Sequence, residues 1–140
     1  MIDRKKDFLI SDNKIIANWL KERKELLVLY SQLVAVTDET PEIEEIELIN
    51  NFSTVLIDYV STGHFGVYEQ LIPNLSLTKE HQAHVFGQIY QTTEIALAFN
   101  DNYENICAKP DYDKFTKDFS IIGEAISIRI DLEDKLLASR

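Results

Sequence analysis

The chain has 140 residues, of which 45% are apolar, and its 24 acidic and 14 basic side chains give a formal net charge of −10. This composition excludes wholesale disorder, and we expect residues 1–140 to form a single helical domain with its own core. The negative charge disfavours direct binding to nucleic acid or to an anionic membrane. It favours a basic protein partner, although it equally suits a plain role in solubility. The 4 glycines and 3 prolines are too few for many short strands, so long helices are predicted.

Two long helices are predicted in the N-terminal half. The first runs from about Asp12 to Val36, with Ser11 or Asp12 as its N-cap, and its apolar residues recur at steps of three and four. The second begins at Thr40-Pro41-Glu42, which combines a capping hydroxyl, a proline at the first helical position and an acid in the first turn. It runs to about Ile72, where Pro73-Asn74 ends it.

Two more helices are predicted in the C-terminal half. The third is capped by Ser76 or Thr78 and reaches about Asn100, and a continuation as far as Ile106 stays open. After the break at Lys109-Pro110, the fourth runs from about Asp111 to Leu137. Long helices joined by short connectors are antiparallel neighbours by default. The predicted fold is therefore all-α, an antiparallel up-and-down four-helix bundle with long helices.

The sequence also indicates a cellular location. Cys107 is the single cysteine, so it allows no internal disulfide, and it is expected to be a small core residue near a helix end. Residues 1–7 are too charged for a signal peptide, and no apolar stretch reaches the length of a membrane span. The expected location is the cytoplasm.

Three charged residues fall on helix faces that are otherwise apolar. On a helical wheel, Arg23 lies in the middle of the first helix's apolar stripe, between Trp19 and Tyr30. Arg129 and Glu133 fall on the stripe of the fourth helix and are four residues apart, so they can pair along one face. A buried arginine is costly when it is unpaired, so each arginine is expected to have a carboxylate or a water-filled cavity beside it.

The second helix has two different faces. One face is apolar, and the other is polar and aromatic, carrying Asp58, Ser61, Phe65, Tyr68 and Glu69. Gly63 and Gly66 inside this helix indicate either the close approach of another backbone or a local kink.

The polar residues of three helices therefore allow two interpretations. They line a polar cleft between the first, second and fourth helices, or they form a closed salt-bridge network that only fixes helix register. The residues concerned are Arg23, Asp58, Ser61, Tyr68, Arg129 and Glu133.

The motifs that would indicate catalysis are missing from the sequence. There is no Gly-rich phosphate loop, no nucleophile elbow and no Glu-x-x-His spacing of a di-iron bundle. His81 and His84 are three apart but lie among polar residues, so solvated side chains are expected. His64 is expected to be a hydrogen-bonded histidine of the core or of a cavity. We therefore expect no catalytic residue, no metal site and no cofactor, and a metal-bearing bundle enzyme is only an alternative.

Three segments carry a family resemblance. The first is Trp19-Leu20-x-x-Arg23-Lys24-x-Leu26-Leu27-Val28-x-Tyr30, and the second is Asp58-Tyr59-x-Ser61-x-Gly63-His64-Phe65-x-x-Tyr68-Glu69. The third is Ile122-Gly123-Glu124-Ala125, followed by Arg129 and by Leu132-Glu133-Asp134-Lys135-Leu136. In this order the three segments resemble the Rsd/AlgQ family of bacterial anti-sigma factors, also called regulators of sigma D.

The resemblance implies a helical protein that is not an enzyme and that binds region 4 of the primary sigma factor. Members block the use of promoter −35 DNA and of core RNA polymerase, so that alternative sigma factors compete better in stationary phase. The implied partner-binding residues are Asp58, Ser61, Phe65, Tyr68, Glu69, Arg23 and Lys24. His64, Arg129, Glu133, Trp19 and Tyr30 are expected in the cleft or its structural network. Exposed aromatic side chains on the second helix would allow a weak homodimer. The alternative function is a sensor that binds a small molecule in the polar interhelical cleft.

Overall fold

The computed structural model describes the backbone of residues 4–140 and the side chains from Lys14 onward. Its elements are α1 (Arg4–Val34), α2 (Glu42–Thr62), a π-helical turn (Gly63–Val67), α3 (Tyr68–Leu71), a 3₁₀ turn (Ile72–Asn74), α4 (Lys79–Tyr103) and α5 (Tyr112–Ala138). The elements from α2 to the 3₁₀ turn follow one another without a break and correspond to the second predicted helix. Every element of the described residues is helical, which confirms the prediction of an all-α bundle.

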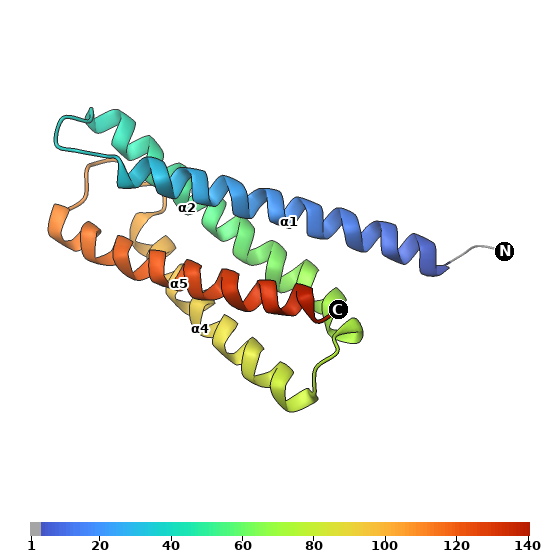
Figure 1. Cartoon of the computed structure of the whole chain (residues 1–140). Helices are drawn as coiled ribbons and strands as arrows, with labels where there is room; N and C mark the ends of the chain where they lie inside the picture. The colour runs from blue at the N-terminus through green and yellow to red at the C-terminus, as the bar shows by residue number, and fades with distance from the viewer. Residues whose placement is uncertain (1–3) are drawn as a thin grey trace.

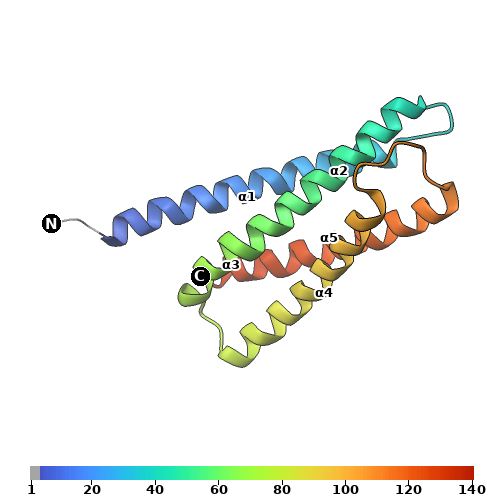
Figure 2. The same ribbon diagram turned by 180° about the vertical axis from the view of Figure 1, so that it is seen from behind.

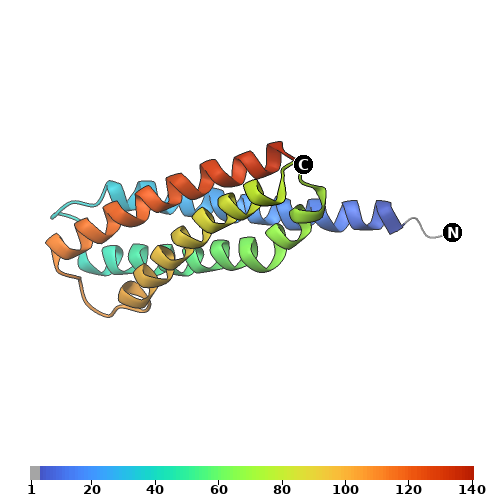
Figure 3. The same cartoon turned by 90° about the horizontal axis from the view of Figure 1, so that it is seen from below.

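The four long helices run alternately up and down (Figures 1 and 2). α1 packs on α2, α2 on α4, and α4 on α5. α5 closes the bundle beside α1, where the rings of Tyr30 and Phe119 stack with their centroids 4.4 Å apart. The view from below in Figure 3 shows that the first turns of α1 run beyond the other helices. Residue 139, after the end of α5, lies beside the connection that leads into α4, where the Ser76 N–H donates to the Ser139 carbonyl at 2.6 Å.

Aromatic rings fill much of the interior between these helices. Phe52 of α2 packs edge-on against Phe99 of α4, with ring centroids 5.5 Å apart, and against Phe119 of α5 at 6.1 Å. Each fully buried apolar side chain of this kind contributes roughly 1.5–3 kcal/mol. The aromatic rings of α1, α2, α4 and α5 therefore stabilise the packing of the bundle. Among the described helices, none meets the length and hydropathy of a membrane span.

The predicted boundaries hold for α4, for α5 and for the end of the second helix near Ile72, whereas the predicted start of α1 and N-cap of α2 were wrong. Thr78 caps α4 by accepting a hydrogen bond from the His81 N–H at 3.0 Å, and Asp111 caps α5 through the Lys114 N–H at 3.0 Å. The Thr40 hydroxyl does not cap α2, because it accepts from the Thr37 N–H instead. α1 begins at Arg4 rather than Asp12, since the segment holds no glycine or proline to stop it.

The loop between α4 and α5 is attached to the side of α2. The Lys109 ammonium lies 3.2 Å from the buried Glu45 carboxylate. The Asn50 side chain accepts from the Ile106 N–H at 2.9 Å and donates to its carbonyl at 3.0 Å. Cys107 lies in this loop and is exposed, so the prediction that it belongs to the core was wrong. The loop contacts α2 through Ile106 and Lys109, which flank the cysteine, and the Cys107 side chain is left exposed.

Gly123 of α5 is required by the position of Tyr30. A Cβ atom at residue 123 would overlap the Tyr30 hydroxyl and would lie 2.8 Å from its Cζ. Gly123→Ala is therefore expected to lower the free energy of unfolding by about 1–3 kcal/mol, as measured by urea denaturation. Gly87 of α4 is the matched control, since a Cβ there meets nothing within 4 Å. Gly87→Ala is expected to raise the free energy of unfolding by up to about 1 kcal/mol, and equal effects at both glycines would contradict this role.

Candidate functional site

A buried carboxylate lies at the centre of the bundle's polar interior. Glu133 of α5 is fully buried. It accepts hydrogen bonds from the Tyr59 hydroxyl of α2 and from the Tyr68 hydroxyl of α3 at 2.6 Å. The Arg129 Nε, one turn earlier on α5, lies 3.3 Å from its second oxygen. Four polar groups from three elements therefore converge on one point in the core.

Arg129 extends this network to α4. Its guanidinium donates to the Thr92 and Thr93 hydroxyls at 3.1 and 2.7 Å. The same group lies 5.7 Å from the ring centroid of Tyr59 and 5.6 Å from that of Tyr68, within the range of cation–π attraction. The buried charge of Arg129 is thus compensated by Glu133, by two hydroxyls and by two rings.

Arg23 connects α1 to the edge of the network. Its guanidinium lies 2.9 Å from the Asp134 carboxylate and 3.8 Å from that of Glu133, and 5.9 Å from the ring centroid of Trp19. Trp19 is fully buried and packs edge-on against Tyr68. Asp134 is exposed, so the outer pair contributes little, and its role is mainly to orient Arg23.

Burial governs the protonation of this network. Burial raises the pKa of the Glu133 carboxyl, although Arg129 and the two tyrosine hydroxyls oppose the shift. Burial, followed by the negative charge of Glu133, raises the pKa of both Tyr59 and Tyr68. Both phenols therefore remain protonated near neutral pH and act as hydrogen-bond donors.

Of the two interpretations that the sequence allowed, the closed network fits the buried residues and the open polar cleft does not. Tyr68, Arg129 and Glu133 belong to the closed network, and the void beside Arg129 has a volume of about 10 Å³, roughly the size of one water molecule. Asp58 and Ser61, which were predicted to line the same cleft, lie exposed outside it. The sequence interpretation missed Tyr59, Asp134, Thr92 and Thr93. The signal for Tyr59 was its position on the apolar face of the second helix.

The π-helical turn explains why Tyr68 is inside. In a regular helix Tyr68 would share the face of Ser61, as was predicted. The Tyr68 N–H instead bonds to the Gly63 carbonyl, five residues back. This turn accommodates one extra residue and rotates everything after it by roughly 100°. Tyr68 is therefore only 3% exposed, and its predicted place on the outer face was wrong.

Gly63 makes this rotation compatible with the core. A Cβ atom there would lie 3.1 Å from the Tyr68 hydroxyl and 3.2 Å from the Trp19 indole nitrogen. A glycine therefore allows both rings to approach the helix backbone closely. The close approach at Gly63 is therefore made by side chains and not, as the sequence interpretation had it, by another backbone.

Four residues remain on the outer surface of the same segment, and we call them the α2 strip: Asp58, Ser61, Phe65 and Glu69. All four are exposed and follow one another at steps of three and four. Phe65 is 72% exposed, a high value for a phenylalanine. The α2 strip therefore presents an aromatic ring between carboxylates.

The α2 strip has aromatic and acidic side chains as neighbours. His64 is half-buried, and its ring packs edge-on between Phe65 and Tyr90, with centroid distances of 4.7 and 5.3 Å. Glu22 of α1 accepts a hydrogen bond from the Thr62 hydroxyl at 3.2 Å. Burial raises the pKa of the Glu22 carboxyl, and the charge of nearby Asp58 adds to the shift. The surface beside Phe65 is therefore acidic on one side and aromatic on the other.

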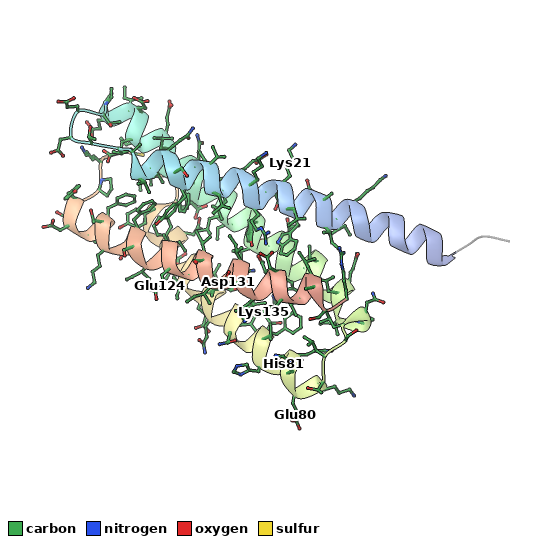
Figure 4. All side chains as sticks on the ribbon, in the orientation of Figure 1. Lys21, Glu80, His81, Glu124, Asp131 and Lys135 are labelled. Carbon is green, nitrogen blue, oxygen red and sulfur yellow. The ribbon has the colours of Figure 1, made fainter. Side chains whose placement is uncertain are left out.

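The remaining predicted site residues are in different places. Lys24 is exposed and lines a groove between α1 and α2. Arg23 turns toward α5 instead, and Tyr30 packs on Phe119, away from the polar network. At the start of α4, Glu80 and His81 point away from the bundle (Figure 4). Among the described side chains, no group of three His, Cys, Asp or Glu could hold a metal ion.

Comparisons with a protein family and with individual curated proteins lead to the same family. The family described as "Regulator of RNA polymerase sigma(70) subunit, Rsd/AlgQ" matches residues 2–139. The chain is 34% identical to a "Regulator of sigma D" from Enterobacter sp. (strain 638), covering 90% of this chain and 79% of the relative. Another "Regulator of sigma D", from Yersinia enterocolitica, is 35% identical over 89% of this chain and 79% of its own length. A third, from Pectobacterium atrosepticum, is 31% identical, with 94% and 90% covered. The chain therefore belongs to the Rsd/AlgQ family of regulators of the RNA polymerase sigma(70) subunit.

Proposed function

We propose that this protein is an anti-sigma factor that binds region 4 of the primary sigma factor through the α2 strip and catalyses no reaction. The observation that carries the proposal is the exposure of Phe65 between the carboxylates of Asp58 and Glu69. An exposed aromatic ring surrounded by charge is typical of an anchor at a protein interface. A basic surface such as the helix-turn-helix of region 4 complements those carboxylates.

The proposed mechanism is competition for one surface of sigma. Region 4 uses its basic side chains for the −35 DNA and an apolar surface for core RNA polymerase. A protein that covers both excludes both, and alternative sigma factors then gain access to the polymerase. The net charge of −10 accelerates the encounter, and Phe65 prolongs the complex once it has formed.

In this proposal the buried network has a positioning role. The Tyr59 and Tyr68 hydroxyls, held on Glu133, fix the rotation of α2 and α3 about their common axis. That rotation decides which side chains face outward. Tyr68 itself, proposed from the sequence as a contact residue, contributes indirectly because it is buried.

The proposal is tested by titrating isolated region 4 of the host's primary sigma factor into the full chain by calorimetry. We expect a 1:1 complex that weakens as salt is raised, because exposed charges contribute to it. Asp58→Lys is expected to weaken binding by about tenfold. Asp131→Lys, which makes the same change on the exposed face of α5, is expected to change binding by less than about twofold. Absence of binding to region 4, or equal losses in both variants, would contradict the proposal.

A further inference from the structure

An open groove runs between α1 and α2 on the outer side of the bundle. Its volume is about 590 Å³. Its apolar lining includes Val28 and Leu29 from α1 and Val55 from α2. Val28 is 48% exposed, so an apolar surface that the bundle itself does not cover faces solvent here. A groove between two packed helices has the shape that accepts a third helix.

The charge along this groove differs from that of the whole chain. Lys21 and Lys24 of α1 line it, and Glu25 is the one acid among the lining residues. Neither lysine forms an ion pair with the side chains that the structure describes. Figure 4 shows Lys21 on the side of α1 turned away from α5. A protein of net charge −10 thus has a locally basic wall along its apolar groove.

The α2 wall of the groove is neutral, lined by Asn51, Thr54 and Val55, and an acid lies just beyond it on the same helix. The hydrogen bond between Glu22 and Thr62 fixes how the antiparallel helices α1 and α2 stand relative to one another. With the same rise per residue on both helices, Lys24 and Asp58 come to nearly the same height along the bundle. Asp58 lies one turn after Thr54, which lines the groove. Asp58 of the α2 strip therefore lies just beyond the neutral α2 wall of the groove, at about the height of Lys24 on the α1 wall.

We infer that this groove seats an amphipathic helix of the protein partner, with carboxylates of that helix facing Lys21 and Lys24. The inference rests on the proposed function and adds a second contact to it. The apolar side of the bound helix packs on Val28 and Val55, and its basic side faces Asp58. The lysines of α1 and the carboxylate of Asp58 beyond the α2 wall favour one orientation of the helix, because the reversed orientation places like charges against each other.

Replacing the two lysines provides a test in which the inference predicts a weaker affinity for region 4 and attraction by net charge alone predicts a stronger one. Each Lys→Glu replacement changes the charge by −2, so Lys21→Glu with Lys24→Glu takes the chain from −10 to −14. A partner attracted only by net charge would bind this variant more tightly. The seated helix instead predicts binding to region 4 that is weaker by about tenfold. The matched control is Lys114→Glu with Lys117→Glu, two exposed lysines with the same spacing on α5. Its affinity is expected to be unchanged or higher.

A steric test avoids charge altogether. Thr54→Trp fills the groove from the exposed side of α2, and Thr116→Trp makes the same change on the exposed face of α5. We expect the first to weaken binding to region 4 by about tenfold and the second by less than about twofold. Thermal unfolding followed by circular dichroism verifies that both variants fold as the unmodified chain does.

The outcomes separate this inference from the proposed function. If the lysine and tryptophan variants of the groove bind as well as the unmodified chain while Asp58→Lys weakens binding, the groove inference is overturned and the proposed function stands. If the unmodified chain does not bind region 4, both are overturned. If an acid-to-lysine change on one helix of region 4 restores the Lys21→Glu, Lys24→Glu variant, the orientation of that helix follows from the position of the change.

Discussion

Replacing Glu133 with leucine is expected to lower the free energy of unfolding by about 3–5 kcal/mol, because it leaves the buried charge of Arg129 without its carboxylate partner. The same change removes the shared acceptor of the Tyr59 and Tyr68 hydroxyls. Urea denaturation gives the magnitude, followed both by circular dichroism and by tryptophan fluorescence. Trp19 is the single tryptophan and packs on both tyrosines, so its emission reports on the site directly.

Two further variants distinguish the network from a general effect of the substitution. Glu124→Leu makes the same change at an exposed position of α5 and is expected to alter the free energy of unfolding by less than about 0.5 kcal/mol. Arg129→Met combined with Glu133→Leu removes both charges and is expected to recover much of the loss, since apolar replacements for a buried pair are often neutral. A double variant as unstable as the sum of its single changes would show that the two groups do not act as a pair.

Replacing Phe65 with alanine is expected to weaken binding to region 4 by about 30-fold, equivalent to about 2 kcal/mol, as for an aromatic anchor at the centre of an interface. The free energy of unfolding is expected to change little, because the ring is exposed in the free protein. Binding calorimetry and the dissociation rate measured by surface plasmon resonance test the first statement, and urea denaturation tests the second. The loss is expected mainly in the dissociation rate, as is usual for interface variants.

Tyr112→Ala is the matched control for Phe65. Tyr112 is 68% exposed, close to the 72% of Phe65, but lies at the start of α5 and outside the α2 strip. Its removal is expected to change the affinity by less than about twofold. If the two aromatic variants lose the same affinity, the α2 strip is not the contact surface and general apolar attraction is the better explanation.

Much of the fold could be predicted because its signals are local. Apolar residues at steps of three and four identified all four long helices, and the caps at Thr78 and Asp111 lie next to the helices that they start. The start of α1 was missed because Ser11 and Asp12 have the chemistry of caps without serving as the N-terminus of the helix. The exposure of Cys107 was missed because it depends on how the loop packs against α2.

The polar residues show where prediction from the sequence reaches its limit. The pairing of Arg129 with Glu133 follows from their spacing of four on one helix. The contribution of Tyr59 depends on the distance between α2 and α5, which no local pattern determines. The position of Tyr68 depends on one hydrogen bond of the π-helical turn. A helical wheel drawn for a regular helix cannot include that bond, so Tyr68 was assigned to the wrong face.

The π-helical turn also makes this segment sensitive to its length. If the same residues formed an ordinary helix, all that follows the turn would be rotated by roughly 100°. Tyr68 would then swing out to solvent, and Glu133 would lose a donor in the core. Deleting the one extra residue between Thr62 and Tyr68 would instead restore an ordinary helix and leave Tyr68 facing the core. The count of residues in this turn is therefore as much a determinant of the protein as the identity of any one side chain.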